Sequence, residues 1–590
     1  MNILLTPARI GPVEIPNRIV MPPMTTRGSD EEGHVTDQTV AYYMARVRGG
    51  TGLITVEMAS PEKAGRHRRR ELGIYDDRFL PGLRRLVDEI HRGGAKASIQ
   101  LGHGGGHTRI DICGETPIAP SAIPHPVYET TLETIIPEAM TKERIVRTTA
   151  AYVAAAHRAE RAGFDCVEIH AAHGYLISQF HAPFENRRTD EYGGSLENRA
   201  RFGLDILRAV KAAVPELGVI YRVSVDDFFD GGLTYAEGRM LAIWAEQAGA
   251  DAIHVTAGHY RSKPTAHRMI PPMNEPDAPF LGYAADIKAQ VGVPVIAVGR
   301  LGDPVTATQA VESGKADFIA LGRTLVADPQ WVEKLRNNEP IRRCLACNTC
   351  VDGMRSGAGI SCVVNGAAGR EAMFADAKPP QGETIAVIGA GPAGLTYASL
   401  VADGNAVTVF EKAGRPGGAF RFAGLAPMFQ EVEADPASLE RYIAGMVAAC
   451  RAKGVTFRLS TDALDIPEEL ATFDRIVIAT GARYRFGLGE PAMAMLDIGA
   501  GRWFGLSRLM ADPKLRDWFY YRARVPTGDR FRGLAGPDQT VTVIGDAASP
   551  GKSKEAIASA FEAALLSGYP ELLLSRIDRT VLSLALNPGS

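Results

Sequence analysis

The stretch Cys344-Leu-Ala-Cys347-Asn-Thr-Cys350, followed by Cys362 after eleven intervening residues, divides this chain into two parts of different pattern. Four thiolates at this spacing can converge on one metal centre, and thiolates are the ligands that iron–sulfur clusters and structural zinc prefer. Zinc sites usually split their ligands into two separated pairs, whereas three cysteines packed closely and a remote fourth favour a 4Fe–4S cluster. We therefore expect these four cysteines to bind a 4Fe–4S cluster, with zinc as the alternative.

The length and composition indicate a multidomain enzyme of ordinary surface charge. A chain of 590 residues is too long for one hydrophobic core, so two or three domains are expected. The net charge of −3 gives no electrostatic case for binding nucleic acid or an anionic membrane. The N-terminus lacks a basic segment followed by an apolar one, and no run of about 18 apolar residues occurs, so neither secretion nor membrane spanning is predicted.

The cysteine count indicates a reducing compartment. Seven cysteines, four of them in one motif, fit the cytoplasm better than a disulfide scaffold. The other three, Cys113, Cys166 and Cys450, are scattered along the chain and are expected to be buried or half-buried thiols.

Residues 1–340 alternate short β-branched runs with longer amphipathic segments, which is typical of βα units and a parallel sheet. The expected strands are 18–21, 53–57, 96–101, 166–170, 219–224, 252–256, 294–299 and 317–321. Helices are expected between them, for example over 141–162 and 234–247. Eight such strands predict a (β/α)8 barrel, with a doubly wound open sheet as the alternative.

In a (β/α)8 barrel, chemistry is expected at the C-terminal ends of the strands. The residues at these ends are Thr25, Gln100, His103, His170, His173, Tyr175, Arg222, His259 and Arg300. The last two strands end in Gly299-Arg300 and Gly322-Arg323. Glycine amides allow close approach and arginine supplies charge-assisted hydrogen bonds, so these two ends predict a phosphate site.

His170 and His173 are three residues apart, and Tyr175 follows them. Two imidazoles can donate hydrogen bonds to a substrate carbonyl or carboxylate oxygen. A phenol beside them can deliver a proton to the carbon next to the one that receives hydride. A metal pair, or histidines bonded within their own loop, are the alternatives, although no nearby carboxylate has an evident ligand spacing.

Five ordered motifs resemble those of the old yellow enzyme family of FMN barrels. They are Asn17-Arg-Ile-Val-Met-Pro-Pro-Met-Thr25, Gln100-Leu-Gly-His103, His170-Ala-Ala-His173-Gly-Tyr175, Arg187-Arg-Thr-Asp-Glu-Tyr-Gly-Gly-Ser-Leu-Glu-Asn-Arg199 and Tyr221-Arg222-Val-Ser224. With the four cysteines attached, the barrel resembles the large members of 2,4-dienoyl-CoA reductase and trimethylamine dehydrogenase type. The resemblance implies FMN at the barrel mouth, with Gln100 and Arg222 at the flavin pyrimidine edge and Gly299, Arg300, Gly322 and Arg323 at its phosphate.

The resemblance points to two kinds of substrate. Thr25 stands in line with the cysteine that bonds flavin covalently in trimethylamine dehydrogenase, so FMN is expected to be non-covalent here. The His170–His173–Tyr175 group is similar to the one that polarises and protonates the substrate in ene-reductases, and trimethylamine dehydrogenase has a tyrosine where His170 stands. The spacing of the first three cysteines is instead similar to that of amine dehydrogenases.

The chain after the cysteines has the pattern of a dinucleotide-binding domain. A polar linker over 370–383 leads into a strand over 384–388 and a Gly-rich turn, and a second strand ends at Glu411, 22 residues after Gly389. The helix start can bind the pyrophosphate and the acid the ribose hydroxyls. The predicted cofactor-binding residues are Gly389, Gly391, Gly394, Glu411, Gly418 and Asp546. FAD is expected, with ADP in its place as the alternative.

A segment that the resemblance leads one to expect is missing. Reductases of the family insert an NAD(P)H-binding domain where only 59 residues separate Gly481 from Val541 here. Gly499-Ala-Gly501 is a weak alternative nucleotide site, because Pro513 and aromatic residues follow it. The aromatic stretch from Trp503 to Tyr521 is expected either to pack beneath the shortened domain or to dock an electron carrier.

These observations predict an FMN barrel over 1–340, a 4Fe–4S segment over 341–370 and an FAD- or ADP-binding Rossmann-like domain over 384–590 with a truncated insertion over 483–540.

The first function hypothesis is hydride exchange between FMN and an α,β-unsaturated carbonyl compound, with electrons passing through the cluster to or from FAD. The second is oxidation of a small amine, with electrons leaving to an electron-transfer flavoprotein. A non-enzymatic redox-sensing role leaves the barrel-mouth residues unexplained. A small-molecule substrate, an electron-carrier partner and a homo-oligomer are expected.

Overall fold

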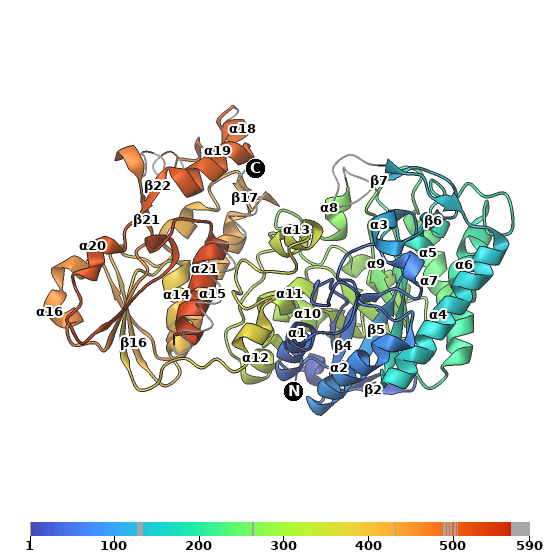
Figure 1. Cartoon of the computed structure of the whole chain (residues 1–590), viewed down its shortest axis with the longest axis horizontal. Coiled ribbons are helices and arrows are strands. Elements are labelled where there is room, and N and C mark those ends of the chain that lie inside the picture. Colours follow the sequence, from blue (N-terminus) through green and yellow to red (C-terminus); the bar gives the residue numbers. More distant parts are fainter. Residues whose placement is uncertain are drawn as a thin grey trace. The chain divides into compact units, whose positions relative to one another are not determined.

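The computed structural model describes residues 2–126, 134–261, 265–430, 432–487, 491, 495, 498–500, 503 and 505–567. The chain divides into two compact units (Figure 1). The first comprises Met1–Asn337 and Asn348–Ile360, and the second comprises Asn338–Cys347 and Ser361–Ser590.

The first unit is a closed barrel of eight parallel strands. In order around the barrel these are β3 (Ile19–Met21), β4 (Leu53–Ala59), β5 (Lys96–Leu101), β10 (Cys166–Ala171), β11 (Gly218–Ser224), β12 (Ala252–Thr256), β13 (Val295–Val298) and β14 (Phe318–Ala320). They coincide with the eight runs expected from the sequence. Because β14 pairs with β3 and closes the ring, the (β/α)8 prediction is confirmed and the open-sheet alternative is excluded.

Helices follow the strands and begin at residues suited to capping. The longer ones are α1 (Asp37–Arg48), α2 (Leu80–Arg92), α4 (Lys142–Ala162), α6 (Leu196–Ala213), α7 (Tyr235–Gln247), α9 (Leu281–Lys288) and α10 (Pro304–Glu312). Thr141 accepts a hydrogen bond from the N–H of Arg144 at the start of α4, and Thr234 and Glu237 form a reciprocal capping box on α7. Gly163 ends α4 with a φ of +93°, a conformation that glycine adopts without strain.

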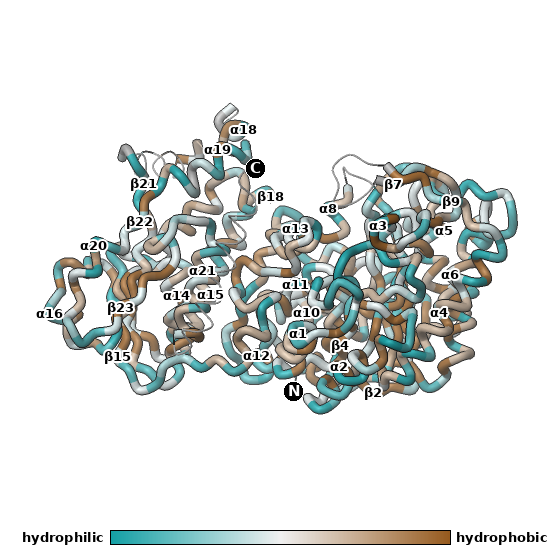
Figure 2. Tube along the Cα trace, viewed as in Figure 1, coloured by the Kyte–Doolittle hydropathy of each residue, from teal (hydrophilic) through white to brown (hydrophobic). Residues whose placement is uncertain are grey.

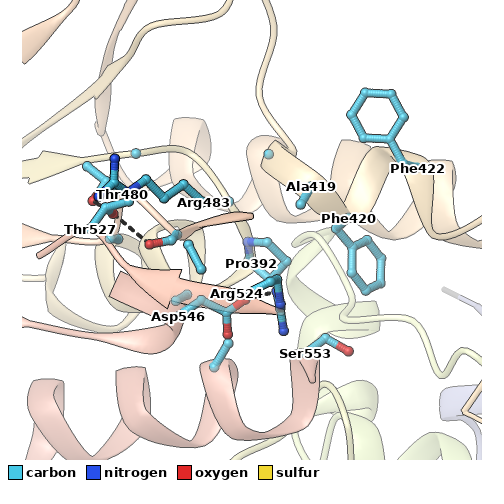
Figure 3. Close-up of a pocket in the computed structure, with 18 of the residues that line it drawn as sticks. Pro392, Ala419, Phe420, Phe422, Thr480, Arg483, Arg524, Thr527, Asp546 and Ser553 are labelled. Atoms are coloured by element: carbon cyan, nitrogen blue, oxygen red, sulfur yellow. Dashed lines mark hydrogen bonds and ion pairs between the residues drawn. The ribbon is translucent and has the colours of Figure 1, made fainter. Parts of the chain in front are cut away.

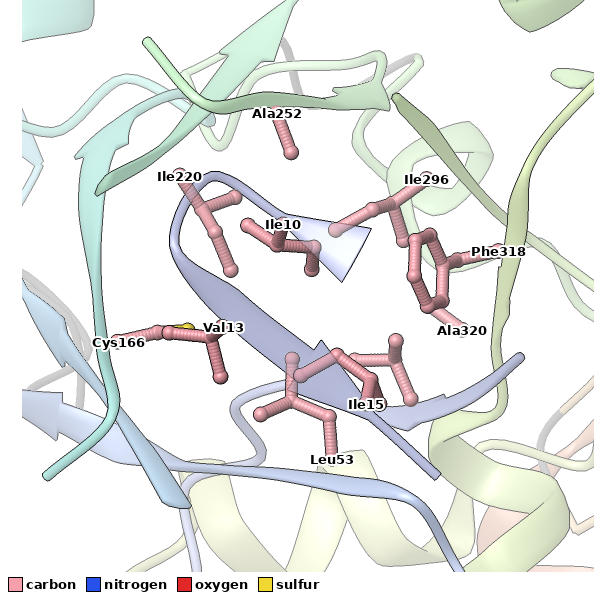
Figure 4. Packing of buried hydrophobic residues seen from close by; sticks show 11 residues of the cluster. Ile10, Val13, Ile15, Leu53, Cys166, Ile220, Ala252, Ile296, Phe318 and Ala320 are labelled. Atoms are coloured by element: carbon pink, nitrogen blue, oxygen red, sulfur yellow. The ribbon is translucent and has the colours of Figure 1, made fainter. Parts of the chain in front are cut away.

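A short hairpin of β1 (Ala8–Ile10) and β2 (Val13–Ile15) plugs the N-terminal end of the barrel. Its three apolar side chains, Ile10, Val13 and Ile15, pack against residues near the starts of the strands, among them Leu53, Cys166, Ile220, Ile296 and Phe318 (Figure 4). Each such buried side chain stabilises the fold by about 1.5–3 kcal/mol. With this end filled by side chains, polar chemistry is left to the opposite end, where the strands finish.

The second unit is built on a parallel sheet of five strands. Their order is β19 (Thr456–Leu459), β16 (Ala406–Glu411), β15 (Thr384–Ile388), β20 (Arg475–Ile478) and β23 (Thr540–Val543). The main helices are α14 (Pro392–Val401), α15 (Pro436–Ala452) and α21 (Ser553–Leu565). In both units apolar residues gather on the central strands and hydrophilic residues on the outer turns (Figure 2). The Rossmann-like prediction is therefore confirmed.

The segment between β20 and β23 is short and mostly helical. It contains an antiparallel pair, β21 (Ala482–Tyr484) and β22 (Arg524–Pro526), and α20 (Asp529–Arg532) follows β22. Between these strands the described residues include α18 (Leu506–Ala511), α19 (Pro513–Asp517) and a π-helical turn (Trp518–Arg522), and they contain no further strand. A second dinucleotide-binding sheet is thus not formed by the described residues of this insertion. No described helix in the chain combines the length and the apolar character that crossing a membrane requires.

Candidate active site and dinucleotide cavity

A buried polar network lies on the inner face of four neighbouring barrel strands. The carboxylate of Glu168 on β10 accepts a hydrogen bond from Nε2 of Gln100 at 2.8 Å and lies 2.8 Å from Nδ1 of His254. Arg222 on β11 lies 3.8 Å from the same carboxylate. Burial acts to raise the pKa of Glu168, but the charges of His254 and Arg222 and its hydrogen bonds outweigh it and lower that pKa. The site therefore holds a buried, ionised carboxylate that is paired with Arg222 and hydrogen-bonded by its neighbours.

Glu168 and His254 were not predicted from the sequence, although Gln100 and Arg222 were. The strand register places Glu168 opposite Gln100, and Arg222 opposite His254. A signal was present in the sequence, because Glu168 and His170 are two residues apart on one strand and so share a face of the sheet. An acid within an apolar strand is rarely buried unless it is paired, so its position alone indicates a polar site.

The buried nitrogen atoms of this region that have no hydrogen-bond partner among the described residues include Nε of Arg222 and Nδ1 of His170. Leaving such a group unpaired typically costs about 1–3 kcal/mol, and more for a charged group. These atoms lie at the C-terminal ends of β11 and β10, where ligands bind in barrels of this type. The donor set thus fits a bound group with carbonyl oxygens or ring nitrogens as acceptors.

Of the four residues predicted to bind the phosphate, the two arginines already bind other groups of the protein. Gly299 has a φ of +109°, and a Cβ there would lie 2.9 Å from the Phe280 ring, so only glycine fits.

The guanidinium of Arg300 binds Asp277 at 2.7 Å and the carbonyl of Glu275 at 2.6 Å. Arg323 likewise bonds to Asn348 and, at 2.8 Å, to a backbone carbonyl. Gly322 begins α11 (Gly322–Ala327), whose first amides have no partner within the helix. Phosphate binding by these four residues stays a prediction.

The structure brings His170, His173 and Tyr175 together. The ring of His170 lies 5.2 Å from that of His173 and 4.9 Å from that of Tyr175, centre to centre. His173 has a φ of +64°, and its Nε2 lies 3.0 Å from the hydroxyl of Thr256. Burial, followed by the charge of Arg222, lowers the pKa of both histidines well below the ordinary value. Both imidazoles are therefore neutral at neutral pH.

The hydroxyl of Tyr175 contacts His67, a residue that was not predicted from the sequence. Its oxygen lies 3.2 Å from Nε2 of His67, whose Nδ1 lies 2.8 Å from the carboxylate of Glu71. Nε of Arg68 also donates to His67 Nε2, at 2.8 Å. Burial and the neighbouring Tyr260 raise the pKa of Tyr175 well above its ordinary value. Tyr175 therefore keeps its proton across the physiological range.

Thr25 is half-buried at the end of β3, and its role toward flavin stays a prediction. The next residue, Thr26, donates its backbone N–H at 2.8 Å and its hydroxyl to the carboxylate of Glu57. Burial raises the pKa of Glu57 to about 7. This acid at the end of β4 was also missed from the sequence.

The two remaining predicted histidines belong to ion pairs at the edge of the site. His103 lies 3.3 Å from Glu62, and His259 lies 3.1 Å from Glu185. His107 and His125, with Glu185, are the metal-type group found among the described residues, and Glu185 also binds Arg261 at 3.3 Å. Since that group does not include His170 or His173, the structure lends no support to the metal interpretation of that pair.

Cys113, Cys166 and Cys450 are buried as expected. Among the predicted cluster ligands, Cys347 and Cys350 are buried and Cys344 and Cys362 half-buried. The backbone N–H of Ala346 lies 3.3 Å from the sulfur of Cys344, and Ala346 has a φ of +51°. Cys344, Cys347 and Cys362 belong to the second unit and Cys350 to the first, so the spacing of the cysteines remains the basis for predicting the cluster.

The second unit contains a cavity of about 1120 Å³ at the C-terminal ends of its parallel strands (Figure 3). Five of the predicted cofactor residues line it: Gly389, Gly391, Glu411, Gly418 and Asp546. The sixth, Gly394, packs beneath, because a Cβ there would lie 2.0 Å from the carbonyl of Gly389. The carboxylate of Glu411 accepts hydrogen bonds from the backbone N–H groups of Ala390 and Ala413, at 2.8 and 2.9 Å. The cavity is large enough for a nucleotide cofactor.

A basic residue lines the cavity beside Asp546. Arg524 on β22 donates to the Asp546 carboxylate at 2.6 Å, and Figure 3 shows both side chains at the cavity wall. Burial raises the pKa of Asp546 despite the opposing charge of Arg524. Arg524 was not predicted, because it comes from the insertion, whose path the sequence does not indicate.

The aromatic stretch predicted to pack or dock is largely at the surface where it is described. The exposed fractions of Trp503, Trp518 and Tyr521 are 58%, 43% and 44%. The side chains of Phe519 and Tyr520, and part of Gly499–Gly505, lie outside the described residues. Packing beneath the domain therefore does not account for these three side chains.

Comparison with known proteins identifies the family. The sequence pattern described as the NADH:flavin oxidoreductase / NADH oxidase family matches residues 3–341, and that of an NAD(P)-binding Rossmann-like domain matches residues 387–426. The chain belongs to the NADH:flavin oxidoreductase / NADH oxidase family. It is an FMN-dependent oxidoreductase, and the resemblance to large old yellow enzyme-type members is confirmed.

The relatives of this chain include proteins named as reductases and proteins named as dehydrogenases. A metal reductase of Desulforamulus reducens is 40% identical over 82% of this chain and 71% of its own length. A cinnamate reductase of Clostridium sporogenes is 34% identical over 82% of this chain and 75% of its own. An N,N-dimethylglycine/sarcosine dehydrogenase of Chromohalobacter salexigens is 32% identical over 82% and 70%. Both reductive and amine-oxidising enzymes therefore occur among its relatives.

Solved structures support the two-part fold. A complex of 2-naphthoyl-CoA reductase has a TM-score of 0.81 and 24% identity over 95% of this chain and 99% of that one. Histamine dehydrogenase from Rhizobium sp. 4-9 has a TM-score of 0.80 and 24% identity over 95% and 96%. At this level of identity the likeness shows the fold alone.

The residues at the barrel mouth of this flavoenzyme fit FMN. Gln100 and the unpartnered Nε of Arg222 offer donors to the flavin pyrimidine carbonyls, and Gly299 and Gly322 allow close approach of a phosphate. When bound, FMN supplies hydride-transfer chemistry. The chain supplies the binding, the orientation and the protons.

Proposed function

We propose that this enzyme reduces the carbon–carbon double bond of an α,β-unsaturated carbonyl compound of enoate or dienoyl type. The observation that carries the proposal is the buried, protonated hydroxyl of Tyr175 beside His170 and His173. A phenol whose pKa is raised is protonated at neutral pH and so has one proton to donate. It suits protonation of the α-carbon, while the β-carbon receives hydride.

The two histidines suit the carbonyl end of such a substrate. Each neutral imidazole has one N–H to donate, and the Nδ1 of His170 has no partner among the described residues. A hydrogen bond to the substrate oxygen stabilises the charge that develops there when the β-carbon receives hydride. The cinnamate reductase among the relatives supports an unsaturated acid as the substrate class.

We further propose that electrons reach the barrel through a 4Fe–4S cluster held by Cys344, Cys347, Cys350 and Cys362, from FAD in the second unit. The spacing of the four cysteines, the burial of Cys347 and Cys350 and the N–H directed at Cys344 support the cluster. The cavity lined by Gly389, Glu411 and Asp546 supports the dinucleotide, and ADP remains the alternative occupant.

Anaerobic titration tests this proposal. The purified enzyme is reduced photochemically and mixed with cinnamate, 2-cyclohexenone or a dienoyl thioester, and flavin reoxidation and the saturated product are measured. Stoichiometric formation of saturated product supports the proposal. Reduced enzyme that none of these acceptors reoxidises, although oxygen does, contradicts it.

A second candidate is oxidation of a small amine, with electrons leaving to an electron-transfer flavoprotein. The cysteine spacing and two 32% identical relatives, named N,N-dimethylglycine/sarcosine dehydrogenase and probable N-methylproline demethylase, favour it. Bleaching of the oxidised flavin by dimethylglycine, sarcosine or N-methylproline in the absence of oxygen would support this direction of electron flow.

A further inference from the structure

The insertion between β21 and β22 forms a thin wall over the dinucleotide cavity. Met510 at the end of α18 and Leu515 on α19 line the cavity. Their sequence neighbours Leu509 and Lys514 are exposed to solvent. A group bound at this wall is thus separated from the surface by the thickness of a single helical layer.

The outer side of this wall carries aromatic and basic side chains together. Lys514, Trp518 and Arg522 are exposed and four residues apart along α19 and the following π-helical turn, so they share one side. Tyr521 is also exposed, and Lys552 lies 5.9 Å from its ring. We call the surface formed by Leu509, Lys514, Trp518, Tyr521 and Arg522 the insertion face. Large apolar side chains gathered on a surface typically mark an interaction site.

The charge of the wall differs in sign from that of the chain. Residues 505–523 contain four arginines or lysines and two aspartates, whereas the chain as a whole has a net charge of −3. A local positive surface attracts an acidic partner and speeds its encounter. Aromatic side chains in a basic setting suit a small, transient interface of the kind that redox proteins use.

We propose that the insertion face docks an acidic one-electron carrier protein, a small iron–sulfur or flavin protein, which exchanges electrons with the group bound in the cavity. The inference rests on the proposed function, because it supplies the electrons for double-bond reduction. Two reduced carriers each deliver one electron, and with two protons these electrons convert one carbon–carbon double bond to a single bond with two new C–H bonds. Two carriers are oxidised for each double bond that is saturated.

The test measures binding, which does not depend on the chemistry at the barrel. The complete holoenzyme is immobilised, and an acidic ferredoxin and the basic cytochrome c are used as probes of opposite charge in surface plasmon resonance. The ferredoxin is expected to bind with an affinity that falls as salt is raised from about 0.05 to about 0.5 M, because salt screens exposed charges. Cytochrome c is expected not to bind.

Variants locate the surface. The Lys514→Glu, Arg522→Glu double variant and the Trp518→Ala variant are each expected to weaken ferredoxin binding about ten-fold or more, because complementary charges become like charges or an aromatic contact is lost. Arg451→Glu, which reverses an exposed cation on α15 in the same unit, is the matched control and is expected to bind normally.

Each outcome decides the proposal. Equal ferredoxin binding by the wild type and both variants overturns it, as does stronger binding of cytochrome c. Binding of duplex DNA in place of ferredoxin, lost in the same variants, assigns the face to another class of partner and also overturns it. If the wild type sediments as a dimer and the variants sediment as monomers, a second copy of the chain covers the insertion face, and the proposal is overturned. Double-bond reduction by photoreduced enzyme tests the proposed function separately, so the two failures are distinguishable.

Discussion

The hydroxyl oxygen of Tyr175 lies 3.2 Å from Nε2 of His67, although 108 positions separate the two residues in the sequence. Nε of Arg68 donates to Nε2 of His67 at 2.8 Å, so that nitrogen is an acceptor and the proton of the neutral ring is on Nδ1, which lies 2.8 Å from Glu71. Both the phenol and Arg68 donate to that one nitrogen. The orientation of the phenol is therefore set by a residue outside the predicted group.

Replacing Tyr175 by Phe is expected to slow reoxidation of the photoreduced enzyme by an enone about 10²–10⁴-fold, the usual contribution of a positioned general acid. The photochemical reduction of the enzyme is expected to be unchanged. Stopped-flow absorbance of the two half-reactions measures both. A parallel fall in both half-reactions would show that Tyr175 has a structural role.

Replacing His67 by Phe is expected to slow the same oxidative half-reaction about ten-fold, because one orienting hydrogen bond contributes about 1–1.5 kcal/mol. His67→Gln keeps an acceptor near the phenol and is expected to recover most of the rate. The pH profile separates the effects, since a purely structural defect lowers the rate equally at every pH. If the Phe and Gln variants behave alike, the hydrogen bond to Tyr175 has no role.

The buried carboxyl of Glu57 is expected to make stability depend on pH. Its pKa is raised from the ordinary 4.5 to about 7 by burial, so the folded chain binds its proton more tightly than the unfolded chain. The wild type therefore loses stability as the pH rises between these two values. Glu57→Gln removes this loss, and its stability relative to the wild type is expected to rise by about 2–3 kcal/mol between about pH 5 and about pH 8.

Urea unfolding followed by tryptophan fluorescence measures the Glu57 difference. Glu62→Gln is the matched control. Burial acts to raise the pKa of Glu62, but His103 and Arg144 outweigh it and lower that pKa to about 2. Glu62 is thus ionised in both states over most of this range, and its variant is expected to show little pH dependence. A flat difference for Glu57→Gln would contradict the assignment.

Protein purified without oxygen is expected to contain about four irons and four acid-labile sulfides per chain, since four thiolates hold one cubane cluster. Cys350→Ala is expected to lose the cluster, whereas Cys450→Ala, at a buried thiol in the second unit, is expected to retain it. Elemental analysis showing zinc in place of iron would end the electron-transfer proposal. FMN is expected to be released on denaturation, because Thr25 offers no thiol.

The flavin of the second unit is expected to be reduced poorly by NADH or NADPH, because the described residues between β21 and β22 form no second dinucleotide-binding sheet. Anaerobic rapid mixing with each nucleotide measures this, with a reduced acidic ferredoxin as the comparison. Fast, stoichiometric reduction of that flavin by NADH, before any other centre, would restore a direct nucleotide-dependent reductase.

Much of the framework followed from local pattern. Eight β-branched runs predicted the barrel strands, because burial on both faces of a parallel strand requires a short apolar run. The glycines of the second unit predicted its cavity for a similar reason: at Gly389 the φ of +108° and the contact with Ala479 admit no side chain. Gln100, Arg222, His170, His173 and Tyr175 were found because they end predicted strands.

By itself the sequence determined the strands, the glycine turns, the spacing of the cysteines and the family. Only the tertiary structure decided which partners meet across the chain: Glu168 with His254, Tyr175 with His67, and Arg524 with Asp546. Strand and turn preferences are set by neighbours a few residues away, so they can be read along the sequence. Contacts between distant segments depend instead on strand register and loop path, which are fixed when the whole barrel closes and the insertion folds over the cavity.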